Sequence, residues 1–283
     1  MNTIDRRARR YLEDVKKIAR NILGENLVSV VVFGSLVRNE LSRASDVDIL
    51  IVVKKYDPRV KTLLRKLQSL ELKYRYSFVP NGFFGKLFYA LSRVTGMFRS
   101  AFVAEFNAIK KWDFARVFGT SKFMTRLLAP TEAVKFTILN SYRVVYGTDP
   151  FDGLKIRKPN YKEIIRSLLM NLLLACASFI LLPLHRETYK FIYEAMKWSL
   201  FNYAYVTQQK PHIRKLSKIF YTPLRRSMEN FIATRENGKL SPGLLLYAIP
   251  SIAKIHISAI RELKRRSLSK KSKGCNIKVK SNR

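Results

Sequence analysis

The chain has 283 residues, 47% of them hydrophobic and 12% aromatic, which is enough for a substantial core and excludes a largely disordered protein. Lysine and arginine total 54 against 20 aspartates and glutamates, a net charge of +34, which indicates a polyanionic partner such as RNA, DNA or an anionic lipid surface, unless the charge is simply spread over all faces. Cys176 and Cys275 lie far apart in the chain and residues 1–17 contain no apolar signal core, so we expect a cytoplasmic protein without a disulfide framework.

Residues 4–23 carry apolar side chains at three- and four-residue steps, a pattern that predicts an amphipathic helix. Val28 to Phe33 is an apolar, β-branched run and predicts a buried strand. Gly34 and Ser35 predict a turn after that strand. Gly34 allows backbone N–H groups to approach an anion closely, Ser35 adds a hydroxyl donor, and a helix beginning near Leu36 would aim its N-terminus at the same anion.

A second apolar run at 47–53 predicts the next strand, and Asp46 and Asp48 lie at its start. Side chains two residues apart in a strand share a face, so both carboxylates are expected to point the same way. Two carboxylates on one face require a compensating cation. Mg²⁺ commonly binds through one or two carboxylates together with substrate phosphates. The sequence therefore predicts a metal and triphosphate site built from Gly34, Ser35 and the two aspartates.

The segments Phe33-Gly34-Ser35 and Ser45-Asp46-Val47-Asp48-Ile49 resemble the signature of the DNA polymerase beta-like nucleotidyltransferase superfamily. In that signature an apolar strand and Gly-Ser are followed, after roughly ten residues, by Asp-apolar-Asp on the next strand. The resemblance covers about the first half of the chain, and the layout looks like that of the small, stand-alone members. The less specific alternative is a hairpin-like turn followed by an aspartate-rich strand start.

The resemblance implies Mg²⁺ or Mn²⁺ bound by Asp46 and Asp48, and an NTP whose outer phosphates contact Gly34 and Ser35. Two further residues lie between the motifs, and their positive charge would neutralise phosphate unless they belong to a solvated turn: Arg38 and Arg43.

Active members of the superfamily place a third carboxylate on the strand after the Asp-x-Asp strand. Residues 101–109 predict such a strand, and Glu105 is our candidate for the third ligand or the base. Glu71 and Asp113 are weaker alternatives. Before this strand, Asp57-Pro58 predicts the start of a helix, and the basic, aromatic segment 83–100 suits a lid, a membrane-surface helix, an RNA-facing flap or a packed insertion.

A strand at 142–147 and a segment rich in proline, glycine and charge at 149–159 predict the end of the first domain. The segment 167–184 contains no charge and is just long enough to span a membrane, but we interpret it as a fully buried helix of a bundle. The helix predicted at 189–206 is interpreted as carrying a core stripe that includes Trp198. We predict that the last helix ends near Leu263, after an interruption at Pro250, and that a basic tail at 264–283 is disordered.

The sequence therefore predicts an α+β protein, in which a small mixed β-sheet nucleotidyltransferase domain packed with helices is followed by an all-α helical bundle. The predicted limits are 1–150, 151–263 and the tail 264–283. The favoured function is metal-dependent transfer of NMP from an NTP to an RNA end, a small molecule or a protein hydroxyl. The first alternative is a weakly active or inactive nucleotidyltransferase fold that binds RNA or DNA or acts as an interaction partner. The second alternative is a peripheral membrane protein, and the sequence leaves the oligomeric state open.

Overall fold

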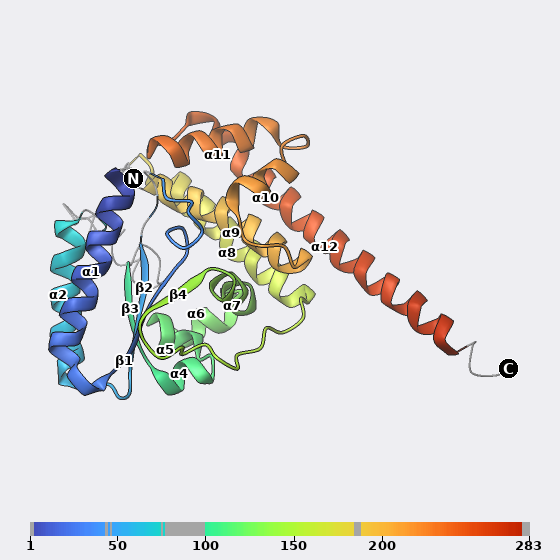
Figure 1. Cartoon of the computed structure of the whole chain (residues 1–283). Helices are drawn as coiled ribbons and strands as arrows, with labels where there is room; N and C mark the ends of the chain where they lie inside the picture. Colours follow the sequence, from blue (N-terminus) through green and yellow to red (C-terminus); the bar gives the residue numbers. More distant parts are fainter. Residues whose placement is uncertain are drawn as a thin grey trace.

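The structure is a computed structural model that describes residues 3–42, 45, 47–74, 76, 100–183 and 188–278. Asp46, Arg43 and the segment 83–99 lie outside the described residues. The fold combines one mixed sheet with many helices (Figure 1), which confirms the predicted α+β class. The helices of the first half are α1 (Thr3–Leu23), η1 (Gly24–Asn26), α2 (Pro58–Lys73), α4 (Phe106–Lys110), α5 (Phe114–Phe118), α6 (Lys122–Leu128) and α7 (Thr131–Leu139).

Within the described part of the chain the sheet has four strands, in the order β3-β2-β1-β4. Their bounds are β1 Leu27–Phe33, β2 Asp48–Val53, β3 Ala101–Glu105 and β4 Tyr142–Gly147. β1 pairs antiparallel with β2 and β4. β2 pairs parallel with β3, and α2 lies between these two strands in the chain. The antiparallel register places Phe33 opposite Asp48, so the residues after β1 lie beside the start of β2.

Alternation along the strands divides the core into two layers. Val32, Ile49 and their same-face neighbours pack against α1 and α2. Val31, Leu50 and the other residues on the opposite face pack against α4 and α5. β3 ends at Glu105 rather than continuing to 109, because the chain turns into α4 at Phe106.

The second half of the chain is helical and packs around α9, whose apolar side chains form the centre of a separate core. Its helices are α8 (Tyr161–Leu181), α9 (Tyr189–Thr207), α10 (Ile213–Ile219), α11 (Arg225–Asn237) and α12 (Pro242–Lys278). Figure 1 shows the end of α12 projecting away from the rest of the molecule.

Two predictions for these helices are wrong. α12 passes through Pro250 and continues to Lys278, so residues 264–278 are helical rather than disordered. Ion pairs of Glu262 with Arg265 and Arg266, three and four residues on, support the helix at this point. α8 is not fully buried, since only 33% of its most apolar 18-residue stretch is buried.

Candidate active site

Gly34 follows the last residue of β1 and begins the turn that faces the start of β2. Its φ is +80°, and a Cβ at this position would collide with Asp48 Oδ2. The Gly34 amide donates a 2.9 Å hydrogen bond to Ser141 O, and the Glu40 amide donates a 2.9 Å bond to Ser35 O. Residues 34–39 form turns and no helix begins near Leu36, so no helix N-terminus points at this site from the turn. Glycine is required here because the carboxylate of Asp48 occupies the space of a side chain.

Asp48 is the first residue of β2 and shares a strand face with Leu50 and Phe33. It lines the same pocket as Gly34 and Ser35. The strand alternation that predicts a common face for Asp46 and Asp48 rests on sequence for Asp46, which lies outside the described residues. Two of the predicted elements, the Gly-Ser turn and the second aspartate, are therefore brought together.

The structure does not bring Glu105 to this pocket. In the parallel register Glu105 pairs with Val53, at the opposite end of β2 from Asp48, and it shares the face of Ala101. Glu105 Oε1 accepts a 2.8 Å hydrogen bond from the Tyr56 amide, a contact that holds the loop after β2. The prediction of Glu105 as the third carboxylate is therefore wrong.

The weaker alternatives also have structural positions. Glu71 Oε1 accepts hydrogen bonds from the amides of Ser100 and Ala101, and the Asp113 side chain accepts a bond from the Arg116 amide at the start of α5. On β3, the residue that lines the pocket together with Asp48 is Phe102. An aromatic ring thus lies beside the aspartate where a third strand carboxylate was expected.

Arg38 lines the pocket from the turn, as its predicted role requires. Its Nε donates a 2.9 Å bond to Glu40 Oε2, and a second guanidinium nitrogen donates a 3.1 Å bond to Ser141 Oγ. Its guanidinium also lies 5.0 Å from the centre of the Phe201 ring. These contacts fix the cation at the edge of the pocket. Arg43 lies outside the described residues.

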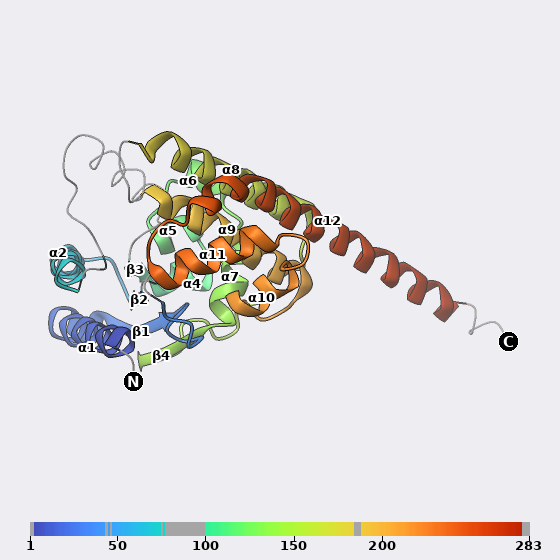
Figure 2. The same cartoon turned by 90° about the horizontal axis from the view of Figure 1, so that it is seen from above.

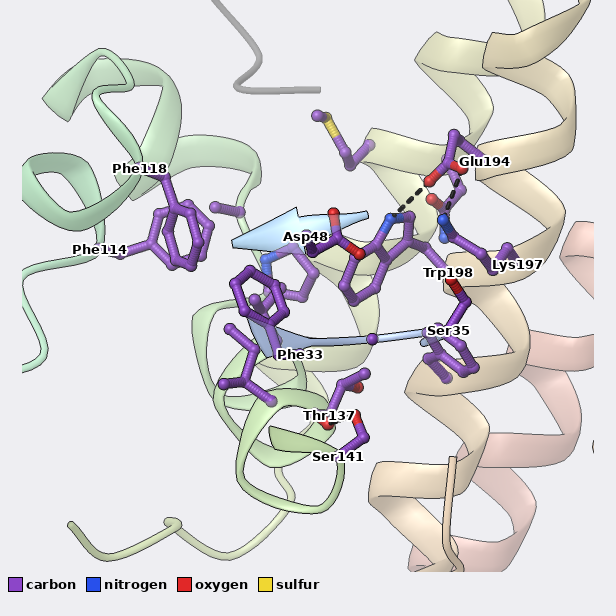
Figure 3. Close-up of a pocket in the computed structure, with 18 of the residues that line it drawn as sticks. Phe33, Ser35, Asp48, Phe114, Phe118, Thr137, Ser141, Glu194, Lys197 and Trp198 are labelled. Carbon is purple, nitrogen blue, oxygen red and sulfur yellow. Dashed lines mark hydrogen bonds and ion pairs between the residues drawn. The ribbon is translucent and has the colours of Figure 1, made fainter. Parts of the chain in front are cut away.

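The pocket is a cavity of about 210 Å³ between the sheet and the helical half of the chain. Figure 3 shows Phe33 and Asp48 between two walls, with Phe114 and Phe118 from α5 on one side and residues of α9 on the other. Thr137 and Ser141, from α7 and the residues after it, lie below. Aromatic rings therefore surround the aspartate on several sides.

Residues of α9 complete the pocket, and sequence reasoning did not assign them to the site: Tyr193, Glu194, Lys197, Trp198 and Phe201. Trp198 was interpreted as part of a core stripe, but its ring lines the cavity. Lys197 Nζ donates a 2.5 Å bond to Glu194 Oε1, and Trp198 Nε1 donates a 3.1 Å bond to Glu194 Oε2. The available signal was a charged pair at a three-residue spacing inside an otherwise apolar helix.

Burial affects one further pocket residue. Tyr193 has its pKa raised well above 10, first because burial penalises the phenolate and second because the Glu194 carboxylate lies nearby. Its hydroxyl therefore stays protonated at neutral pH.

The residues present fit a divalent cation bound between the turn and β2. The missing side chain of Gly34 leaves the Asp48 carboxylate directly against the turn, and carboxylate oxygen is a ligand that Mg²⁺ prefers. Within the described ranges there is no cluster of three or more His, Cys, Asp or Glu side chains. Asp46, which lies outside the described residues, stays the second ligand that the sequence predicts.

A comparison with protein families matches residues 12–97 to the nucleotidyltransferase domain. This match covers the second half of α1, the Gly-Ser turn and the aspartate strand. Residues 12–97 therefore carry the sequence features of a nucleotidyltransferase domain. A comparison with curated proteins gives no match.

The fold likeness extends beyond the nucleotidyltransferase domain. The chain is similar to the crystal structure of spectinomycin adenyltransferase AAD(9) from Enterococcus faecialis with ATP and spectinomycin, at a TM-score of 0.54 and 13% identity. The similarity covers 90% of this chain and 98% of that one. The nucleotidyltransferase domain and the helices that follow it therefore share one overall fold with that enzyme.

Proposed function

We propose that this protein transfers a nucleoside monophosphate from an NTP to the hydroxyl group of a small molecule. The observation that carries the proposal is a single pocket into which the Gly34-Ser35 turn, Asp48 and the α9 residues all face. The turn and the aspartate provide a place for the triphosphate. The opposite wall on α9 provides a place for an acceptor.

In the proposed reaction the acceptor oxygen forms a bond to the α-phosphorus of the NTP. The bond from that phosphorus to the bridging oxygen of the β-phosphate breaks, and pyrophosphate leaves. Mg²⁺ or Mn²⁺ bound at Asp48 and Asp46 would neutralise the charge of the triphosphate. Ser35 and backbone N–H groups of the turn bind outer phosphates. Glu194, the other described carboxylate in the pocket, is positioned to accept a hydrogen bond from the acceptor or its hydroxyl proton.

An enclosed acceptor site favours a small molecule over an RNA end. Phe33, Phe114, Phe118 and Trp198 line the cavity, and concave sites with apolar walls and a few polar groups are typical of small-ligand binding. The structure of the similar adenyltransferase holds ATP and spectinomycin, which supports a nucleotide and a small acceptor on this fold.

A second candidate function, binding of RNA or DNA by a weakly active fold, is favoured by the net charge of +34. This charge far exceeds what a triphosphate site needs. Phosphate contacts by lysine and arginine would give affinity with little sequence preference and a steep dependence on salt.

Calorimetric titration with each NTP in the presence of Mg²⁺ or Mn²⁺, followed by a pyrophosphate-release assay over a panel of hydroxyl compounds and RNA, tests the proposal. We expect NTP binding and pyrophosphate release that depends on a small acceptor, with both lost in Asp48→Asn. Asp5→Asn is the matched control, because Asp5 pairs with Arg9 on the surface of α1. Absence of NTP binding by the unmodified protein would refute the proposal, and release that depends on RNA alone would favour the second function.

A further inference from the structure

The polarity of α8 is reversed relative to that of an ordinary surface helix. Its buried residues include the polar side chains Ser167, Asn171 and Ser178. Its exposed residues include Lys162 and Cys176 but are mostly large and apolar: Tyr161, Ile165, Leu169, Leu173, Phe179 and Ile180. A helix on a water-facing surface normally places these two kinds of side chain the other way round.

The buried polar groups of α8 have partners inside the helical half. Asn171 Nδ2 donates hydrogen bonds to Ser167 Oγ at 3.3 Å and to Ser199 Oγ on α9 at 3.1 Å. Ser167 Oγ lies 3.1 Å from His256 Nε2 on α12, which is 1% exposed. Ser178 Oγ donates to Thr188 O at 2.8 Å. Polar side chains that face the interior of a bundle, with apolar ones outside, are typical of helices in contact with lipid.

The outer face of α8 is strongly apolar. Leu173 is 54% exposed and Ile180 is 70% exposed, and no charged residue occurs in α8 after Arg166. α6 packs against α8 and exposes Phe123 and Leu127. Figure 2 shows α6, α8 and α12 at one side of the molecule, away from α1 and α2. Exposed apolar residues on adjacent helices mark an interaction surface rather than scattered surface residues.

The net charge indicates which partner covers this face. At +34, two copies of the chain repel one another, whereas an anionic bilayer attracts the chain. α8 and residues 242–269 of α12 are each long and apolar enough to cross a membrane. The other side of α8, however, is held by the polar contacts to α9 and α12 described above. With this side of α8 packed against α9 and α12, only its opposite face is available to lipid.

We propose that the apolar face formed by α8 and α6 docks on the surface of an anionic lipid bilayer, with its leucine, isoleucine and phenylalanine side chains in the interfacial region. Lysines and arginines elsewhere on the chain add attraction to the anionic headgroups. This binding requires no nucleotide and is independent of the transferase reaction.

Vesicle flotation with the full-length protein tests the proposal. We expect the protein to float with phosphatidylcholine vesicles that contain phosphatidylglycerol and to bind pure phosphatidylcholine vesicles more weakly. The double variant Leu169→Glu and Leu173→Glu should lower the partition coefficient by at least about tenfold, because two apolar side chains no longer enter the bilayer. Leu64→Glu is the matched control, since Leu64 is an exposed leucine on α2.

Thermal unfolding followed by circular dichroism confirms that each variant is folded, because all three positions are exposed. Failure of the unmodified protein to float, or equal flotation of the double variant, would overturn the proposal. Size-exclusion chromatography could also refute the proposal. If the unmodified protein is a dimer and the double variant is a monomer, the face binds a second copy of the chain. If only detergent, and neither salt nor carbonate, releases the protein from cell membranes, α8 spans the bilayer and the proposed interfacial position is wrong.

Discussion

Replacing Gly34 by alanine separates the backbone requirement of the turn from its role in the site. Gly34 has a φ of +80°, and a Cβ there would collide with Asp48 Oδ2. The backbone conformation alone costs an L-residue about 1–2 kcal/mol. The collision forces either the carboxylate or the turn to move, so we expect the site to be damaged beyond this loss of stability.

Gly153→Ala is the matched control. Gly153 has a nearly identical φ of +77°, but a Cβ there meets no atom within 4 Å. Both variants should therefore lower the melting temperature similarly, by about 2–4 °C for each kcal/mol in a protein of this size. Only Gly34→Ala should lose nucleotide binding. Displacing one charged ligand costs about 3 kcal/mol, which corresponds to roughly a hundredfold loss of affinity or rate.

Differential scanning calorimetry measures the stability of both variants, and titration with Mg²⁺–NTP measures their affinity. If Gly34→Ala binds nucleotide as well as Gly153→Ala does, the carboxylate and the turn do not form one site, and the assignment of Gly34 and Asp48 is refuted.

Three other substitutions test separate parts of the structure. Glu105→Gln should leave the rate of pyrophosphate release within about twofold of the unmodified protein, because Glu105 lies at the far end of the strand; a tenfold loss would contradict this placement. Glu194→Gln should raise the KM for the acceptor about tenfold, the magnitude of one charge-assisted hydrogen bond, with an unchanged Kd for nucleotide; a change confined to nucleotide binding would contradict the proposed role. Burial lowers the pKa of His256 from 6.5 to about 4, so as the pH falls the unfolded chain binds the proton first. The free energy of unfolding should therefore decrease by about 1.4 kcal/mol for each pH unit as the pH falls from 6.5 to 4. Urea titrations at several pH values measure this free energy, and its dependence on pH should be weaker in His256→Gln than in the unmodified protein.

The local part of the fold was predictable because its signals lie close together in the sequence. Two β-branched runs, the Gly-Ser pair between them and the aspartate at the second strand fix the turn and Asp48 through strand alternation and one glycine. The same alternation predicts the face of the sheet on which Glu105 lies, but not whether Glu105 lies near the start or the end of β2. The helix at 58–73 contained that information, because a strand–helix–strand unit gives parallel strands whose first residues lie together.

The α9 side of the pocket depends on contacts between residues far apart in the chain. Glu194 and Trp198 approach the aspartate only because the two halves pack against each other, and no local pattern specifies this packing. The exposure of α8 was missed for a related reason. A charge-free segment predicts burial in something apolar, but the sequence does not say whether that surrounding is protein or lipid.

The turn after Ser35 joins the two halves of the chain. Glu40 O accepts a hydrogen bond from the buried guanidinium of Arg235, and Glu40 Oε1 accepts one from the Arg214 amide at 3.4 Å. The same residue binds Arg38, which contacts Ser141, the acceptor for the Gly34 amide. The first 150 residues alone therefore keep the Ser141 contacts of the turn but lack the two arginine contacts to Glu40 that come from the helical half. A design that grafts this turn onto another scaffold must therefore carry α10 and α11 with it, because they supply the Arg214 and Arg235 contacts to Glu40.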